Sequence, residues 1–180
     1  GPRRSACACP AALSSRRRIS ALADAAMPKA PPPPPLVGNH SKVIRRKPGA
    51  FEWADVALEA YKADTESWKG ITRRELIGKR GESPAFHVRY FEIQPGGHST
   101  LEKHEHEHVV VPLRGVGEAQ AGCYIWKVGA GDVVYVSPSD PHQFRCPADA
   151  EEPFGFLCIV NAERDRPTTV DGLGVCHICE

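Results

Sequence analysis

Residues 96–115 read GGHSTLEKHEHEHVVVPLRG and carry the densest group of ionisable side chains in the sequence. Four histidines and three glutamates fall within the eleven residues from His98 to His108. Side chains alternate between the two faces of a strand, so ionisable residues at alternate positions are predicted to share one face. These residues are Glu102, His104, His106 and His108. Burying them together without partners would be very costly, whereas a divalent cation bound by imidazole and carboxylate removes that cost. The alternative is a solvent-exposed strand edge with fortuitous metal affinity.

A second stretch, GDVVYVSPSDPH at residues 131–142, predicts a strand, a tight turn and a histidine that opens the next strand. Together the two stretches resemble the two-part motif of the cupin superfamily, whose fold is a small jelly-roll β-barrel. The first motif fits every spacing between Gly96 and Gly115, with Glu102 in a histidine slot and His108 in the glutamate slot. The resemblance therefore implies a permuted set of three histidines and one glutamate as metal ligands. This set is Glu102, His104, His108 and His142.

The second motif departs from the family pattern at three positions. Ser137, Ser139 and Cys146 stand where cupins usually carry proline, glycine and asparagine, which leaves the geometry of the turn open. An alternative frame for the first motif would use His104 and His106 as the paired histidines. The frame with Glu102 is preferred because it preserves both glycine spacings.

Candidate catalytic residues lie near the predicted ligands. In the preferred frame His106 stands beside the metal or at the pocket rim, and Tyr135 is the preferred auxiliary acid or base because a nearby cation lowers a phenol's pKa. Arg89 would clamp a substrate carboxylate if it points inward, and a surface salt bridge is the alternative. Cys146 shares strand parity with His142 and could approach the metal, although a buried inert thiol is the simpler expectation. Other side chains that could line the pocket, or simply pack the core, are Tyr90, Trp126, Phe144, Phe156 and Cys158.

Short segments rich in Val, Ile, Phe and Tyr surround the motifs and are separated by Gly, Pro, Asp and Ser breaks. They predict an all-β fold, a single cupin jelly-roll (double-stranded β-helix) barrel. The expected strands are 71–77, 86–94, 108–113, 123–128, 132–136, 142–146 and 154–160. Residues 53–62 (WADVALEAYK) have loose helical spacing and predict one short helix. The family resemblance covers residues 84–161, with a compact hairpin expected at 116–130.

Charge divides the chain of 180 residues and 19.6 kDa into two parts. Residues 1–50 hold ten Lys and Arg against one acid, and residues 51–180 hold thirteen against twenty-one. We expect a disordered basic, proline-rich leader at 1–50, an extension at 51–83, the barrel at 84–165 and a C-terminal tail at 166–180. A mildly acidic domain argues against a nucleic-acid reader, and no run approaches the roughly 18 apolar residues of a membrane span.

The leader bears on localisation. Gly1 and Pro2 look like the scar of a cleaved tag, and residues 3–26 are rich in Arg, Ala and Ser, as in organellar transit peptides. The alternative is translated sequence upstream of Met27. Seven cysteines without regular spacing favour a reducing compartment, so a cytoplasmic location is expected, with a mitochondrion or plastid as the alternative. Cys176 and Cys179 form a CxxC pair that could be a zinc clip or redox switch, or simply tail thiols.

The function expected from this resemblance is that of a mononuclear metal enzyme acting on a small polar metabolite. One divalent transition metal per chain is expected, with Fe favoured and Zn, Mn, Ni or Cu as alternatives. An Fe-dependent dioxygenase is preferred, a metal-dependent lyase or isomerase comes second, and a non-catalytic small-molecule-binding cupin is the rival. Cupins commonly pair by strand exchange, and residues 66–80 could supply such a strand, so a homodimer is expected.

Overall fold

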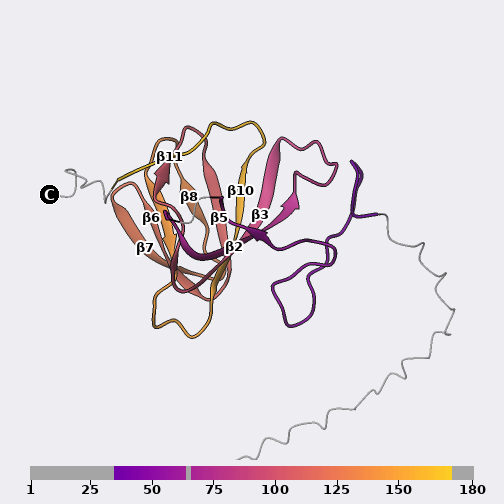
Figure 1. Cartoon of the computed structure of the whole chain (residues 1–180). Helices are drawn as coiled ribbons and strands as arrows, with labels where there is room; N and C mark the ends of the chain where they lie inside the picture. The colour runs from indigo at the N-terminus through magenta and orange to yellow at the C-terminus, as the bar shows by residue number, and fades with distance from the viewer. Residues whose placement is uncertain (1–34, 64–65, 172–180) are drawn as a thin grey trace, which may run out of the picture. The chain divides into compact units, whose positions relative to one another are not determined.

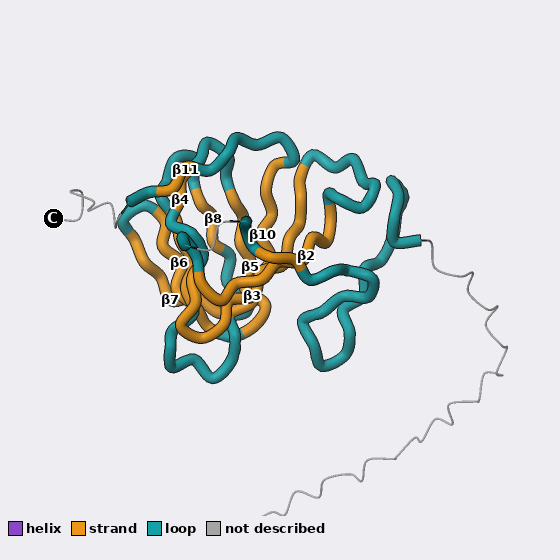
Figure 2. The backbone as a smooth tube through the Cα atoms, in the orientation of Figure 1, coloured by secondary structure: helices purple, strands orange, loops and turns teal. Residues whose placement is uncertain are grey.

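The computed structural model describes residues 35–63 and 66–171, and within these ranges the chain is all-β, with no helix (Figure 1). One sheet of eleven strands curls on itself, so that orange strands wrap around an interior (Figure 2). The predicted all-β jelly-roll fold is confirmed. The strands are β1 (Glu59–Ala60), β2 (Lys69–Ile77), β3 (Phe86–His98), β4 (Glu102–Lys103), β5 (His108–Arg114), β6 (Val116–Ala121), β7 (Tyr124–Gly129), β8 (Val134–Val136), β9 (His142–Arg145), β10 (Phe154–Asn161) and β11 (Thr168–Thr169).

The middle of the sheet is the antiparallel pair β3 and β10. On its other edge β10 pairs with β5, and β3 pairs with β2. Because side chains alternate along β3, Phe91 faces the main core with Phe156, and Tyr90 faces a second, smaller core beneath Trp53. The main core fills the interior of the curled sheet and forms the wall against which the functional side chains lie.

The helix predicted at residues 53–62 is wrong. This segment is a loop followed by β1, and Asp55 has a positive φ of 58° that no α-helix tolerates. Its apolar residues anchor the loop to two different cores: Trp53 and Val56 join the smaller one and Tyr61 the main one. The loose spacing of these anchors therefore reflects two packing surfaces rather than one helical face.

The expected domain boundaries also shift. Lys42, inside the expected disordered leader, pairs with Glu82 at 2.7 Å, and both side chains are less than a tenth exposed. At the other end Thr168 pairs with Lys103, so the sheet continues beyond residue 165. The proline run, apart from Pro35, the transit-like segment and Cys176 to Cys179 lie outside the described residues. The described residues include no helix long and apolar enough to cross a membrane.

The two glycines that frame the first motif are required by backbone geometry. Gly96 and Gly115 have φ values of 74° and 62°, in the left-handed region that glycine adopts readily. A Cβ atom on Gly115 would clash with the carbonyl oxygen of Pro153. These positions therefore fix the ends of the segment that carries the histidines.

Candidate metal centre

The histidine-rich segment is not one continuous strand, which corrects the sequence-based expectation. β4 ends at Lys103 and β5 begins at His108, and the residues between them form a bend. The ring of His104 closes this bend by donating from Nδ1 to the carbonyl oxygen of His106 at 2.8 Å. All of the predicted ionisable residues are nevertheless buried, each less than a tenth exposed. They are Glu102, His104, His106 and His108.

Strand pairing brings in the second motif. His142 opens β9 and lies directly opposite Glu102 of β4 in the antiparallel register. The preceding turn is tied to the bend, since the Ser139 amide donates to the carbonyl oxygen of His104 at 2.7 Å. Ser139 has a φ of 65°, so this serine keeps the left-handed geometry of the glycine whose place it takes. The tight turn of the second motif therefore forms, although serine replaces the usual glycine.

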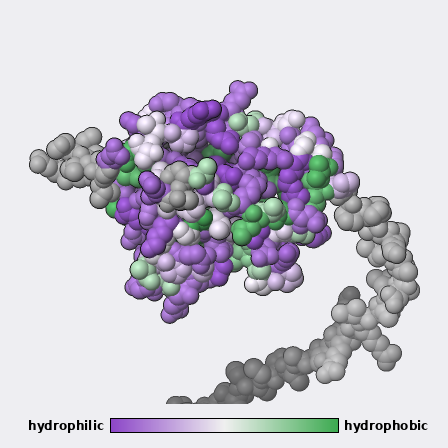
Figure 3. Space-filling view, viewed as in Figure 1, coloured by the Kyte–Doolittle hydropathy of each residue, from purple (hydrophilic) through white to green (hydrophobic). Residues whose placement is uncertain are grey.

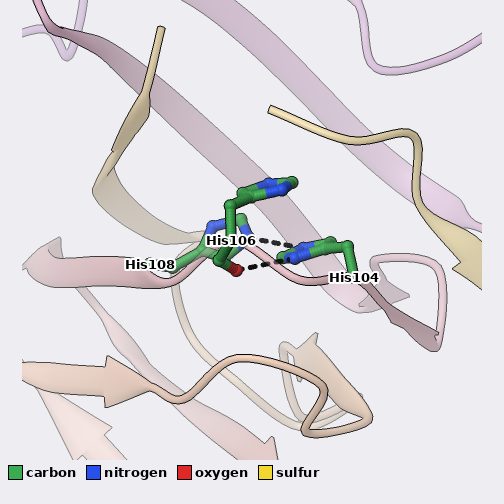
Figure 4. A group of neighbouring side chains, drawn as sticks. All are labelled: His104, His106 and His108. Carbon is green, nitrogen blue, oxygen red and sulfur yellow. Dashed lines mark hydrogen bonds between the residues drawn. The ribbon is translucent and has the colours of Figure 1, made fainter. Parts of the chain in front are cut away.

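Donor atoms gather in two overlapping groups around His104. One contains His104, His106 and His108, and the other contains Glu102, His104 and His142; within each group the ligand atoms lie within 4.8 Å of one another. The Nε2 atoms of His104 and His108 are 2.6 Å apart (Figure 4). The structure thus brings together all four residues of the preferred ligand set, and also His106 from the alternative frame.

Each imidazole of the preferred set is oriented by a partner at its Nδ1 atom. Besides His104, His142 donates to the carbonyl oxygen of Asp140 at 3.0 Å, and His108 Nδ1 lies 3.1 Å from the Sγ atom of Cys158. A proton on Nδ1 leaves the Nε2 lone pair for a metal, and such outer contacts are the usual means of orienting metal-binding histidines. This arrangement therefore fits a bound cation.

Burial is the main reason that the imidazoles of His104, His108 and His142 are neutral. Burial, and then the neighbouring His142, lower the pKa of His104 to about 4, and the same two causes lower the pKa of His108. Burial also lowers the pKa of His142. Neutral imidazoles are the form that binds metal, and three of them with one carboxylate suit a divalent transition metal.

His106 has a different partner. Its Nδ1 atom lies 2.6 Å from Asp165 Oδ1, and its ring stacks on His104 with centroids 3.6 Å apart. Hydrogen bonds from His106 and from the Glu105 amide lower the pKa of Asp165 to about 2. Sequence analysis missed Asp165 because it lies 59 residues beyond His106, on the loop after β10, and no local pattern points to it.

Glu102 and the four histidines at positions 104, 106, 108 and 142 line a cavity of about 110 Å³. In this part of the lining, Glu102 accepts a hydrogen bond from Lys62. Apolar side chains form another part: Ile71, Phe91, Phe144 and Phe156. Four cationic side chains form a third part: Lys62, Arg73, Arg89 and Arg164. A cavity of this size suits a small ligand that carries negative charge.

Several sequence-based candidates do not reach this cavity. Tyr135 is 60% exposed, because it stands between the buried Val134 and Val136 on β8 and so points to the opposite face. Its assignment as an acid or base at the metal is therefore corrected. The Cys146 thiol is directed to the carbonyl oxygen of Glu152, outside the cavity. Tyr90 and Trp126 are also elsewhere, whereas Phe144, Phe156, Cys158 and Arg89 do line it.

Comparisons with known proteins agree with this geometry. A family model described as a cupin domain matches residues 89–160. A 1-methylthio-D-xylulose 5-phosphate methylsulfurylase from Rhodospirillum rubrum is 42% identical over 130 residues, covering 72% of this chain and 81% of that protein. The crystal structure of a cupin-2 domain protein from the same organism has a TM-score of 0.62 at 42% identity, covering 71% of this chain and 83% of that one. A cupin 2 conserved barrel protein from Rhodopseudomonas palustris gives 0.60 at 40% identity, covering 66% and 80%.

Proposed function

The chain belongs to the cupin superfamily, and from that premise we propose that it is a metal-dependent enzyme that transfers a methylsulfur group from a small phosphorylated ketose to a thiol. The observation that carries this proposal is the 42% identity over 130 residues to a methylsulfurylase named for 1-methylthio-D-xylulose 5-phosphate. The cavity supports it, because donors for a metal and side chains for an anion line the same small space.

The residues that would hold the ion are Glu102, His104, His108 and His142. Three imidazole nitrogens and one carboxylate suit Fe, Mn, Ni, Cu or Zn better than Ca or Mg. When bound, such an ion supplies a Lewis acid that polarises a ketone oxygen. The apolar wall of Phe91, Phe144 and Phe156 limits water around that carbonyl.

The chemistry of the substrate explains why a polarised ketone matters. In a 1-methylthio 2-ketose the sulfur is bonded to the carbon beside the carbonyl group. A thiolate attacks this sulfur, a new S–S bond forms, and the C1–S bond breaks with its electron pair delocalised onto the ketone. A proton then adds to C1. The products are a methyl disulfide of the thiol and a 1-deoxyketose phosphate, so atoms and electrons balance with one thiol as co-substrate.

His106 is the residue that moves this proton. Asp165 accepts from its Nδ1 atom and fixes the ring, which leaves Nε2 to take the proton of the thiol and return it to C1. His106 is buried and lines the cavity, as a base that meets the substrate must.

The test is to incubate metal-loaded protein with 1-methylthio-D-xylulose 5-phosphate and a low-molecular-weight thiol, and to follow the methylthio signal by proton NMR. The expected result is its conversion to a methyl disulfide. In His106→Gln we expect kcat to fall about 10²- to 10⁴-fold with the metal content retained. His98→Gln, a change of histidine on the same segment but outside the cavity, is the control and keeps its rate. An unchanged methylthio signal with each of the five metals would overturn the proposal.

A second candidate function is the Fe-dependent dioxygenase expected from the sequence. The three-histidine, one-carboxylate donor set favours it, since this set suits iron. Oxygen uptake by the iron-loaded protein with a ketose substrate would support this candidate, whereas the same turnover under argon would support methylsulfur transfer. A lyase or isomerase would release a product without consuming either oxygen or thiol.

The homodimer and the cytoplasmic location stay proposals. Residues 66–80, expected to exchange between copies, contain β2, which pairs with β3 and β1 of its own chain. The face seen in Figure 3 is largely hydrophilic, with small separate hydrophobic groups. Light scattering at micromolar concentration tests the dimer: twice the chain mass supports it and a single chain mass refutes it.

A further inference from the structure

We propose that Arg89 and Arg164 form a phosphate-binding subsite in the cavity, beside the candidate metal centre. That an anion binds here follows from the side chains themselves; that the anion is a phosphate ester of a ketose rests on the proposed function. The subsite would hold the far end of the substrate while the ketone lies at the histidines.

Two different segments place these guanidinium groups at one cavity. Arg89 is on β3, in register with Glu75 of β2 on one side and with Cys158 of β10 on the other. Arg164 follows β10 on the same loop as Asp165, and its Nη1 atom donates to the carbonyl oxygen of Asn161 at 2.9 Å. Both side chains are half-buried, and both line the cavity.

Among residues 35–63 and 66–171, no carboxylate forms an ion pair with either guanidinium. Among the described residues the other cations of the cavity have such partners, since Lys62 pairs with Glu102 and Arg73 pairs with Glu59. A charge withdrawn from water without a partner is costly, and an anion in the cavity removes that cost.

The hydrogen-bond capacity of Arg89 is also unfilled, whereas Arg164 Nη1 lies within hydrogen-bond distance of His87 and of two backbone carbonyl oxygens. The Nε atom of Arg89 is buried without a hydrogen-bond partner, and one of its terminal nitrogens contacts only the Cys158 Sγ atom at 3.4 Å. Both guanidinium groups line the same small cavity, and burial, followed by the charge of Arg89, lowers the pKa of Arg164. An anion between them would offset these like charges.

Glu75 is the carboxylate to consider as a competitor. It is buried opposite Arg89; its Oε1 atom pairs with Arg73 at 3.5 Å and Lys79 at 3.3 Å, and its Oε2 atom has no hydrogen-bond partner. The surrounding positive charge therefore exceeds what one carboxylate neutralises. A phosphate dianion, which accepts several hydrogen bonds from planar guanidinium groups, suits such a pair of arginines.

The position of the subsite fits a substrate that spans the cavity. The Cys158 Sγ atom lies 3.1 Å from His108 Nδ1 and 3.4 Å from Arg89 Nη2, so one sulfur contacts both a candidate metal ligand and an arginine of the subsite. A short ketose phosphate has its carbonyl and phosphate groups at opposite ends of one chain. The two ends of the cavity thus offer a cation for the oxygen and arginines for the phosphate.

The test is calorimetric titration of metal-loaded protein with inorganic phosphate. We expect Arg164→Gln to weaken phosphate binding about tenfold or more, the effect of losing a hydrogen bond between charged groups. Arg166→Gln, an exposed arginine on the same loop, is the matched control and keeps its affinity. Arg89→Lys retains the charge without the planar fork, and we expect an intermediate loss, with folding checked by circular dichroism.

The outcomes separate this subsite from the proposed reaction. Equal phosphate affinity in wild type and Arg164→Gln, or an equal loss in Arg166→Gln, would overturn the subsite even if the ketose is consumed. Phosphate binding that depends on Arg164, with no ketose consumption, would uphold the subsite and refute the reaction. With turnover, Arg164→Gln should raise KM for the phosphorylated ketose and leave KM for its unphosphorylated analogue unchanged.

Discussion

The two ends of the cavity differ in charge: one is lined by neutral imidazoles and the other by arginine cations. At one end, buried imidazoles are held neutral and oriented by partners at Nδ1, so their remaining lone pairs converge on a position that suits a cation. At the other end, Arg89 and Arg164 line the cavity, and no ion pair in the described part of the chain joins a carboxylate to either of them. The difference shows how one sheet prepares a small space for a ligand that has a polarisable carbonyl and an anionic group.

The two ends also differ in how they are built. Sheet register and a bend fix the histidine end, since Glu102 and His142 are paired residues of β4 and β9. The arginine end joins the first part of β3 to the loop after β10. We therefore expect a substitution at the histidine end to change metal affinity and one at the arginine end to change phosphate affinity. A side chain that contacts both ends should change both affinities.

The largest expected effect is loss of metal at the histidine end. Substituting Glu102→Ala or His104→Ala should weaken metal binding more than about 100-fold, since loss of outer partners alone costs 10- to 100-fold. Phosphate binding that depends on Arg164 should survive in the same proteins. Competition with a chelator, read by elemental analysis, measures the affinity.

The His106→Ala variant distinguishes the ligand set that contains Glu102 from the alternative set that contains His106. Retention of metal within about threefold supports the set with Glu102, because outer contacts contribute less than ligands. A loss as large as that of His104→Ala would assign His106 as a ligand and contradict this set.

The second effect is a pH dependence that belongs to the histidine end. The pKa of His104 is about 4 in the folded chain and 6.5 in its ordinary state, so the unfolded chain binds more protons between these values. The metal-free protein should therefore lose stability as the pH falls from 6.5 to 5, by roughly 2 kcal/mol from His104. Urea denaturation at several pH values measures this. His104→Gln should flatten the profile, and an equally steep profile in that variant would count against the neutral cluster.

The third effect concerns the Cys158 Sγ atom, which contacts both His108 and Arg89. Cys158→Ala removes the Sγ contacts to His108 and Arg89, and we expect metal binding to weaken about tenfold, with phosphate binding weakened as well. Cys146→Ala, another buried thiol but outside the cavity, is the control. If the two variants behave alike, Cys158 is a packing residue and does not couple the ends.

The smallest effect concerns Glu75. Glu75→Gln removes the carboxylate that faces Arg89 across β2 and β3, so the arginine end becomes more positive. We expect phosphate to bind about threefold more tightly, with metal affinity unchanged. The same calorimetric titration measures it. Weaker phosphate binding would mean that Glu75 positions the arginines rather than competing with the anion.

The sequence predicted that the ionisable side chains of the first motif converge, but the continuous strand assumed for them was wrong. The spacing of Glu102, His104 and His108 indicated convergence, yet a bend rather than strand alternation achieves it. No glycine or proline lies between residues 103 and 108, so nothing in the local sequence marks the bend. For Tyr135 the signal was present: apolar Val134 and Val136 on either side already indicated that Tyr135 faces the other way.

Other features required the tertiary structure. Arg164 reaches the cavity and Asp165 reaches His106 because β10 returns beside β5 and β3, and no periodicity of the loop encodes that approach. Ser139 shows the converse, because a left-handed residue can be held by hydrogen bonds to His104 and Glu105 without glycine. Sequence alone could therefore predict the fold and most ligand candidates, but not which charges lack partners.

Anomalous diffraction from crystals of manganese-loaded protein soaked with inorganic phosphate would locate the metal and the anion in one experiment. We predict one strong anomalous peak within about 2.0–2.3 Å of the Glu102 carboxylate and the Nε2 atoms of His104, His108 and His142. Phosphate density should lie against Arg89 and Arg164. A manganese peak bound by His106 in place of Glu102, or phosphate density away from both arginines, would contradict the account.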